Sequence, residues 1–515
     1  MDKKRSILNI GVSILSRIIM LCAALYVRRL LIQYIGNAVN GLNSLYTSII
    51  GMLSVAELGV GSAIVYSMYH PIVNGDKHKV AALFCLYKKV YLVIGVVIAI
   101  GGLIVTPCLP SLIKEYDKLN INVYVTYLLT LSSVVISYLY SAKTSLIEAY
   151  KDNYITTGIL GISRLIRYVL QGVSILLWKS YTLFLICQII ETLLAWGLTE
   201  MMAYRKHADI IEMHESVDQD TKAEVWRNVK AMFMHKIGTI LVNSVDSMII
   251  SAYIGVVALG KYSNYMLIAS VAAGTIGLFF TSLSSIVGHL CAVGKPEQTR
   301  KYFDRFYCLN YILGFVFFLG YFATADSLVS LCFGPSLDLS RAIVFIIAMN
   351  QFTSFMRRTS LLFRDASGTF YYDRWKPVVE GVVNLFLSIL FVNVFPEGYR
   401  MAGVIAATIA TSLLICHTVE PYVVFHHVFY AKPKSFYLRN YGYIALFAIC
   451  LSCMTWIIKP YNTIIASVII NGLFSLLVSV LAMSFLFVVD KGFRNEVRAL
   501  IRAIPTWMTK LSDHE

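Results

Sequence analysis

Long hydrophobic runs, separated by short polar segments, recur along the whole chain. A run of about 20 apolar residues can cross the hydrocarbon core of a bilayer as an α-helix. The longest polar segment is the stretch 205–230, and the other connections are short. The pattern predicts fourteen membrane spans, at about 8–33, 41–68, 81–107, 122–147, 155–177, 181–204, 231–254, 260–290, 306–325, 340–363, 377–396, 401–427, 439–458 and 462–489.

The positions of the lysines and arginines indicate how these spans are oriented. With the N-terminus in the cytoplasm, 31 of the 44 lysines and arginines fall in cytoplasmic segments and seven fall in outer loops. Cytoplasmic loops of membrane proteins are enriched in these residues, and a miscounted span would invert every later loop. We therefore expect a multi-pass protein with both termini in the cytoplasm. The first run is too long for a cleavable signal peptide, so we expect none.

The composition agrees with a membrane protein and excludes several other classes. The chain is 58% hydrophobic and 14% charged, with a mean hydropathy of +0.69, whereas soluble domains are about 25% charged. The net charge of +15 is then mostly a topology signal, so we expect no nucleic-acid partner. The ten cysteines are scattered, and Cys450 and Cys453 lie inside a predicted span without histidines nearby. We expect no disulfide framework, no metal site and no cofactor.

Motifs of catalysis are missing from the sequence. There is no phosphate-binding loop of the GxxxxGK[ST] type, no HExxH and no GxSxG. The outer loops are about 15 residues or shorter, which leaves little room for an extracytoplasmic active site. We therefore expect a transporter with no catalytic residues.

An internal repeat divides the predicted spans. A shift of 219 residues aligns Tyr34-Ile35-Gly36 with Tyr253-Ile254-Gly255, and Gly41 with Gly260; a slightly different shift aligns the segment from Lys143 to Leu146 with that from Arg358 to Leu361. The repeat predicts an all-α polytopic fold with two parallel six-helix lobes and two further helices, and such transporters bind substrate between their repeats. The expected divisions are a lobe at 1–204, a cytoplasmic linker at 205–230, a second lobe at 231–430, two helices at 431–490 and an amphipathic tail at 491–515.

Six basic residues lie inside predicted spans, where a charge is costly unless it faces a cavity or a partner. We expect them to line a cavity that attracts an anion, because the arginine fork binds phosphate well. Arg28 and Arg29 also lie near enough to the outer end of their span to reach the interface. Arg164 and Arg167 could instead pair with Glu191 and hold two helices together. The six candidates are Arg17, Arg28, Arg29, Arg164, Arg167 and Lys236.

Two acidic residues in spans are candidates for ion coupling. Glu57 and Asp246 each end a polar stripe on an apolar helix. Removal from water favours the protonated form of a carboxyl group, which suits proton coupling. Structural pairing with a neighbouring helix is the alternative for both residues.

Three stretches of the sequence resemble a known family. They are YIGNAVNGLNSLY at 34–46, AELGVGSAIVYSMYHPIVNGD at 56–76 and FRDASGTFYYDRWKPVVEGVVNLFLSI at 363–389. With the predicted layout, they resemble the polysaccharide transporter branch of the multidrug/oligosaccharidyl-lipid/polysaccharide exporter superfamily, the Wzx-type flippases of lipid-linked oligosaccharides. The resemblance covers essentially the whole chain.

The resemblance implies a function in a bacterial cytoplasmic membrane. Such proteins move an undecaprenyl-pyrophosphate-linked oligosaccharide from the cytoplasmic to the outer leaflet, for capsule or other surface polysaccharide. The implied mechanism is alternating access, with the lipid tail remaining in the membrane. Membrane lipid and the lipid-linked oligosaccharide are the expected partners, and a polysaccharide polymerase with its chain-length machinery is the candidate protein partner.

Three alternatives remain from the sequence. A multidrug cation antiporter of the same superfamily would have the same lobes but a cavity rich in carboxylates and aromatic rings. A lipid II flippase would share the chemistry and differ in the glycan. A membrane polysaccharide polymerase is disfavoured by the short outer loops and the repeat.

Overall fold

The computed structural model describes residues 3–57, 60–114, 116–213, 215–217, 219 and 244–512. Every regular element among these residues is helical, which confirms the expected all-α class. The chain forms two compact units, Met1–Gly260 and Lys261–Glu515. Sequence reasoning puts the start of the second lobe at 231, and the division into six-helix lobes stays a prediction.

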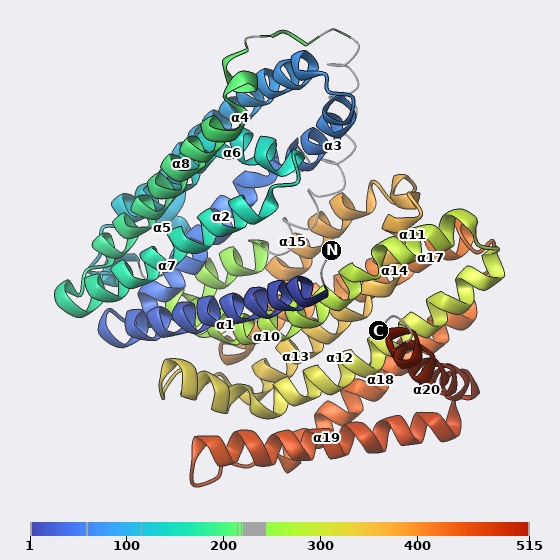
Figure 1. Cartoon of the computed structure of the whole chain (residues 1–515). Coiled ribbons are helices and arrows are strands. Elements are labelled where there is room, and N and C mark those ends of the chain that lie inside the picture. The colour runs from blue at the N-terminus through green and yellow to red at the C-terminus, as the bar shows by residue number, and fades with distance from the viewer. Residues whose placement is uncertain are drawn as a thin grey trace. The chain divides into compact units, whose positions relative to one another are not determined.

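Unit 1 is built from long helices that pack side by side. Figure 1 shows α4, α6 and α8 running alongside one another, and α7 packs against α8. The helices are α1 (Lys3–Tyr34), α2 (Asn37–Leu53), α3 (Val60–Val73), α4 (Lys77–Val105), α5 (Leu109–Leu112), α6 (Val123–Ala149), α7 (Asn153–Trp178), α8 (Tyr181–Glu212) and Ser244–Ile254, with short turns η1 (Ser54–Glu57), η2 (Thr106–Cys108), η3 (Tyr116–Lys118) and the π-helical η4 (Ile250–Ile254).

Unit 2 is arranged around α12, which packs against α13, α18 and α19. Its first helix begins at the end of unit 1. The elements are α10 (Val256–Ser282), α11 (Ser284–Val293), α12 (Pro296–Phe333), α13 (Arg341–Met356), α14 (Arg358–Ala366), η5 (Thr369–Tyr371), α15 (Lys376–Val394), η6 (Glu397–Tyr399), α16 (Arg400–Thr411), the π-helical η7 (Ser412–Cys416), α17 (His417–His427), α18 (Lys434–Ile457), α19 (Ile464–Val489) and α20 (Lys491–Ser512).

The expected spans fall on these helices, apart from 231–243, which lies outside the described residues, and several expected spans are divided. The run 41–68 becomes α2 and α3, the run 260–290 becomes α10 and α11, and the run 340–363 becomes α13 and α14. Within the described residues, nine helices are long and apolar enough to cross a membrane. The structure thus has a multi-pass helical architecture, and the count of fourteen spans stays a prediction.

The division between α13 and α14 is stabilised by a side chain from another helix. The amide of Asn310, on α12, donates to the carbonyl oxygens of Phe355 and Met356 at 3.1 and 3.4 Å. A side chain that bonds to helix carbonyls satisfies groups that the interrupted ladder leaves open. Asn310 is fully buried, so this contact lies in the interior of unit 2. The hydropathy of the run 340–363 gives no sign of the break.

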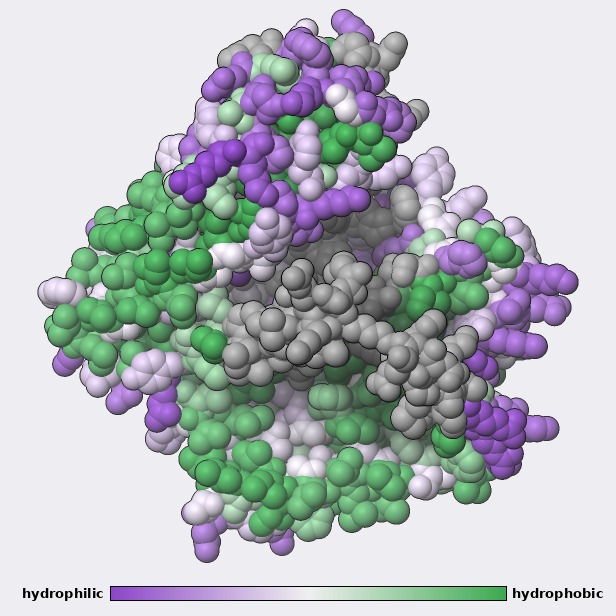
Figure 2. Space-filling view, in the orientation of Figure 1, coloured by the Kyte–Doolittle hydropathy of each residue, from purple (hydrophilic) through white to green (hydrophobic). Residues whose placement is uncertain are grey.

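The outer surfaces of the helices are apolar. Figure 2 shows broad hydrophobic areas, including the surface over α19. On α19, Leu473 and Leu481 are 61% and 60% exposed. Exposed apolar area of this extent is expected where lipid replaces water as the solvent.

The repeat found in the sequence recurs in the backbone. The N–H groups of Gly36 and Gly255 donate to the carbonyls five residues earlier, of Leu31 and Ile250, at 3.1 and 2.9 Å. The two glycines have φ of 118° and 124°, a region that favours glycine. The same turn therefore ends α1 and η4, and each turn leads directly into the next helix.

Two further glycines of the repeat allow a close helix crossing within unit 1. A Cβ atom on Gly41 would collide with the carbonyl oxygen of Val256, and one on Gly260 would collide with the carbonyl oxygen of Asn37. The amides of Asn37 and Asn40 donate to the carbonyls of Val257 and Gly260 at 2.8 and 3.1 Å. Small residues let membrane helices approach closely, and side-chain amides bond across the crossing.

Substitution at this crossing should destabilise the protein. We expect Gly41→Ala to lower the stability by about 1–3 kcal/mol, the range for overpacking a close contact, seen as a lower Tm of the purified protein in detergent. Gly197→Ala in α8 is the matched control, because a Cβ there meets nothing within 4 Å. Equal Tm values for the two variants would contradict the close contact.

Candidate functional site

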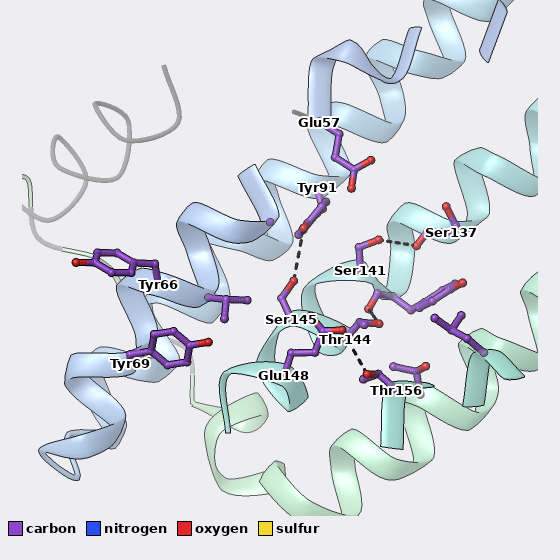
Figure 3. Close-up of a pocket in the computed structure, with 15 residues that line it drawn as sticks. Glu57, Tyr66, Tyr69, Tyr91, Ser137, Ser141, Thr144, Ser145, Glu148 and Thr156 are labelled. Carbon is purple, nitrogen blue, oxygen red and sulfur yellow. Dashed lines mark hydrogen bonds between the residues drawn. The ribbon is translucent and has the colours of Figure 1, made fainter. Parts of the chain in front are cut away.

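Unit 1 contains a cavity of about 660 Å³. Its walls come from α3, α6 and α7, with further side chains from η1, α4 and α8, and Figure 3 shows Tyr66 and Tyr69 on the opposite side from Ser141, Ser145 and Glu148. This volume lies in the range of small-molecule sites, about 300–1,000 Å³. The lining residues are Glu57, Gly61, Val65, Tyr66, Tyr69, Tyr91, Ser137, Tyr140, Ser141, Thr144, Ser145, Glu148, Thr156, Leu160 and Thr199.

One wall is a polar stripe on α6. Ser137, Ser141, Ser145 and Glu148 recur at intervals of four, four and three residues, so they share one face of the helix. The Ser141 hydroxyl donates to the carbonyl of Ser137 at 2.9 Å. Hydroxyls that bond back to their own helix remain able to accept a second hydrogen bond. The wall is therefore polar without leaving a buried group unsatisfied.

Tyrosines form much of the remaining lining. Tyr66 and Tyr69, on α3, are 71% and 43% exposed, whereas Tyr91 and Tyr140 are buried. The hydroxyls of Tyr91 and Ser145 lie 3.5 Å apart, joining α4 to α6. The cavity thus combines two accessible tyrosine rings with a polar wall whose side chains are held by hydrogen bonds.

Two carboxyl groups line the cavity. Glu57 lies in η1, where the helical path between α2 and α3 is interrupted, and its Oε2 accepts a hydrogen bond of 2.6 Å from the hydroxyl of Tyr138. Glu148 lies at the end of α6, and its Oε1 accepts from the Thr156 hydroxyl of α7 at 3.3 Å. Glu57 was expected from the sequence as a polar position in a span, and here it belongs to this cavity.

The predicted cations of α7 are placed in ion pairs with α8. Arg167 Nη1 lies 2.6 Å from Glu191 Oε2, and Arg164 Nε lies 3.8 Å from Glu191 Oε1. The Arg164 side chain is 53% exposed, and that of Arg167 is 19% exposed. On α6, Lys143 is buried and pairs with Glu200 of α8. This geometry matches the structural alternative that the sequence left open for Arg164 and Arg167.

The structure says less about the other predicted site residues. Arg28 is half-buried and Arg29 exposed on α1, and Asp246 is buried in the helix Ser244–Ile254. Arg17 belongs to α1, but its side chain lies outside the described part of the chain, as does all of Lys236. Among the eight candidates, Arg164 and Arg167 are brought together through Glu191.

Unit 2 holds a buried network of two cations and two carboxylates. Arg357, at the break between α13 and α14, bonds Glu420 of α17 at 2.6 Å and Glu380 of α15 at 3.3 Å. Lys376 lies 2.6 Å from Glu420 and 2.7 Å from Glu380. The charges balance, and Glu420 is fully buried. The network joins α15 and α17 to the break between α13 and α14.

The residues that match the α6 wall in unit 2 have a different character. A shift of 215 residues, which aligns Lys143 with Arg358, relates the α6 wall to α13 and α14. Thr144 and Ser145 match Thr359 and Ser360, but buried bulky side chains replace four other lining residues, and the ring of Phe352 lies 3.8 Å from that of Phe447. The corresponding pairs are Ser137 and Phe352, Tyr140 and Phe355, Ser141 and Met356, and Glu148 and Phe363.

The described residues contain no group of three or more histidine, cysteine or acidic side chains that could hold a metal ion. The cavity offers hydroxyl groups, aromatic faces and carboxylates, which bind and orient polar ligands. Sequence reasoning missed all of its lining except Glu57. The stripe on α6 has the same helical spacing as the polar stripes that end at Glu57 and Asp246. It consists mostly of serines, which are common in membrane helices and do not by themselves indicate a binding site.

Known proteins resemble this chain in fold but hardly in sequence. No protein-family model matches the chain, and no curated protein matches it either. A multidrug resistance MATE family transporter of the MOP superfamily, in its inward-facing conformation, is 12% identical; the match covers 83% of this chain and 95% of that chain, with a TM-score of 0.59. The lipid II flippase MurJ, in an inward closed conformation, is 14% identical, with 91% and 99% covered and a TM-score of 0.59.

A mutant of the Vibrio cholerae MATE transporter VcmN matches as well. It is 13% identical, with 80% of this chain and 99% of that chain covered and a TM-score of 0.51. These similarities show that the chain has the fold of the MATE and MurJ transporters. Fold alone does not identify a substrate, because one fold serves many functions.

The contact between Arg167 and Glu191 can be tested by exchanging the two charges. We expect Arg167→Glu to lower the stability by on the order of 3 kcal/mol, since it leaves two acidic groups together in a largely buried place. Adding Glu191→Arg should restore most of the lost Tm. Arg164→Ala, at a mostly exposed side chain, should change the stability by less than about 1 kcal/mol. A double variant no more stable than Arg167→Glu would contradict a structural pair.

Proposed function

We propose that this protein is a flippase for lipid-linked oligosaccharides, which it moves from the cytoplasmic to the outer leaflet of a bacterial membrane for surface polysaccharide synthesis. The observation that carries the proposal is the cavity of unit 1, whose chemistry suits a glycan. The fold shared with the MATE transporters and MurJ supports transport as the general activity. The resemblance of the three sequence stretches supports an oligosaccharide as the cargo.

Sugars present two kinds of surface, and the cavity has a counterpart for each. The face of a pyranose ring that carries axial hydrogens is apolar and packs on aromatic rings, here Tyr66 and Tyr69. Its hydroxyl groups donate and accept hydrogen bonds, and the serines of α6 and the carboxylate of Glu148 can pair with them. Residues of both kinds lie around one space of about 660 Å³.

The expected topology puts this cavity on the side from which the substrate comes. With the N-terminus in the cytoplasm, the connections α3–α4 and α6–α7 are cytoplasmic. Tyr69 lies one turn before the end of α3, and Glu148 lies at the end of α6. The cavity would then occupy the cytoplasmic half of unit 1, where a headgroup made in the cytosol first meets the protein.

The pyrophosphate would need other residues. A dense anion that leaves water requires cations, and Arg17, Arg28, Arg29 and Lys236 remain our candidates for that contact. Arg164 and Arg167 are weaker candidates, because Glu191 already neutralises part of their charge. An inside-negative potential favours outward movement of negative charge, by about 2.3 kcal/mol per charge per 100 mV.

One observation favours a second candidate, a multidrug cation antiporter. Glu57 and Glu148 stand among tyrosine rings, and carboxylates with aromatic faces also attract organic cations. The fold similarity to a multidrug transporter is as high as that to MurJ, with a TM-score of 0.59 for each. A glycan and an organic cation are therefore the two substrates that an experiment must distinguish. A lipid II flippase would differ from our proposal only in the glycan that it carries.

Deletion of the gene in the native bacterium tests the function directly. We expect undecaprenyl-linked repeat units to accumulate in the cytoplasmic leaflet and surface polysaccharide to be lost, because export would stop after the cytosolic steps. Extraction of lipid-linked glycans, with an assay of the leaflet that holds them, measures this. Unchanged polysaccharide with increased sensitivity to cationic drugs would favour the antiporter, and lysis with accumulated lipid II would favour the cell-wall flippase.

The repeat supplies substitutions that should fill the cavity and leave the helix intact. We expect Ser141→Met and Glu148→Phe, the residues at the matching positions of unit 2, to reduce export in the complemented deletion strain at least about tenfold, a loss of about 1.4 kcal/mol. Ser132→Met is the matched control, because Ser132 is exposed on α6 and does not line the cavity. Full export by cavity-filled variants that insert normally would exclude this cavity as the glycan site.

A further inference from the structure

The charge of the cavity restricts the kind of sugar that can enter it. Its lining contains two acidic side chains, Glu57 and Glu148, and no lysine, arginine or histidine among the described residues that form it. Both carboxyl groups are half-buried. Their hydrogen-bond partners, Tyr138 and Thr156, are uncharged hydroxyls. The carboxylates are therefore held in place without being neutralised by these contacts.

Several cations on the surrounding helices are engaged by other carboxylates. Lys143, on the same helix as the polar stripe, pairs with Glu200. At the cytoplasmic end, Lys206 lies 2.6 Å from Asp152, and Lys77 lies 2.5 Å from Asp209.

On α7, Arg164 and Arg167 share the single carboxylate of Glu191. This leaves an excess positive charge, and Arg164 follows the lining residue Leu160 by one turn. The two carboxylates of Glu57 and Glu148 outnumber this one excess cation, so these groups together remain net acidic.

From this arrangement we infer that the sugar held in the cavity carries no acidic substituent and that Glu57 and Glu148 select a neutral or, preferentially, an amino sugar. The inference rests on the proposed function and adds the substrate class of its site. A carboxylate or phosphate on the sugar would lie within a few ångströms of Glu57 or Glu148, where like charges repel strongly in a partly desolvated space. It would also lose water, and the described lining offers it no cationic side chain in return.

An amine fits the same surroundings well. An ammonium group has three donors and no acceptor, so it suits carboxylate oxygens and hydroxyls that can still accept. The faces of Tyr66 and Tyr69 add a favourable cation–π surface at the exposed side. The pyrophosphate of the lipid carrier must then lie away from this cavity. The sugar and the pyrophosphate of one substrate would thus bind at places of opposite charge.

Binding of three short oligosaccharides to the purified, nanodisc-embedded protein tests the inference. The probes are trimers of glucosamine, N-acetylglucosamine and galacturonic acid, titrated at a mildly acidic pH that keeps the amines protonated. We expect the glucosamine trimer to bind at least about tenfold more tightly than the galacturonic acid trimer, a difference of about 1.4 kcal/mol, with the neutral trimer between them.

Removal of one carboxylate should reduce the discrimination. Glu148→Gln keeps the shape and should narrow the difference between the charged trimers to about twofold; Glu57→Gln serves if that variant fails to fold. Glu397→Gln is the matched control, because Glu397 lies in unit 2 with its side chain 81% exposed. It should leave all three affinities unchanged.

The outcomes separate this inference from the proposed function. Equal binding of all three trimers, abolished by Ser141→Met, would overturn the selection by charge and leave the glycan site in place. Tighter binding of the galacturonic acid trimer would overturn it as well. Failure of every trimer to bind, with binding of tetraphenylphosphonium instead, would overturn the proposed function together with the inference.

Discussion

A charged or polar group inside a bilayer must find a partner within the protein or face water, and this requirement organises both units. Hydrocarbon offers no hydrogen bonds, so an unpaired charge there is costly. In unit 1 the requirement is met by pairs that join α6 and α7 to α8, such as Arg167 with Glu191. In unit 2 it is met by the network around Glu420. Polar groups left outside these pairs, such as the α6 stripe, line the cavity.

The two halves of the repeat use equivalent positions for different purposes. The backbone turn at Gly36 recurs at Gly255, which indicates a common template. On that template, Ser137 and Glu148 of the α6 wall correspond to buried phenylalanines in unit 2, where the rings of Phe363 and Phe303 lie 5.2 Å apart. Aromatic packing of this kind fills space and stabilises a helical core. At these matched positions, unit 1 thus lines a ligand-sized cavity, whereas unit 2 packs aromatic side chains against one another.

The sequence predicts the general architecture because hydropathy and helix length are set by the bilayer. The all-α class and the positions of the long helices follow from runs of about 20 apolar residues. The interruptions do not follow, since the run 340–363 stays apolar through the break that Asn310 stabilises from another helix. A contact with a residue far away in the sequence does not change the pattern of apolar residues in the run, so this pattern cannot predict the break.

The candidate site was predicted only in part, for a related reason. Charged residues in spans are conspicuous, so Glu57 was singled out and the pairing of Arg167 with Glu191 was foreseen as an alternative. Serine, threonine and tyrosine are ordinary in membrane helices, and their hydroxyls usually bond to the preceding turn. Ser141 does so here, while it also faces the cavity. Only the packing of α3, α4 and α7 around α6 shows that these ordinary residues share one space.

The same hydrogen bonds suit a site that must be emptied as well as filled. A ligand that leaves a buried site normally exposes polar groups that have lost their partners, which raises the free energy of the empty state. In this cavity Ser141 and Thr144 donate to carbonyls of their own helix, and Glu148 accepts from Thr156. The empty cavity therefore keeps its polar groups paired. Under the proposed function the site is filled and emptied in turn, so neither state should be much more stable than the other. A wall of self-bonded hydroxyls meets that condition better than a set of unpaired charges would.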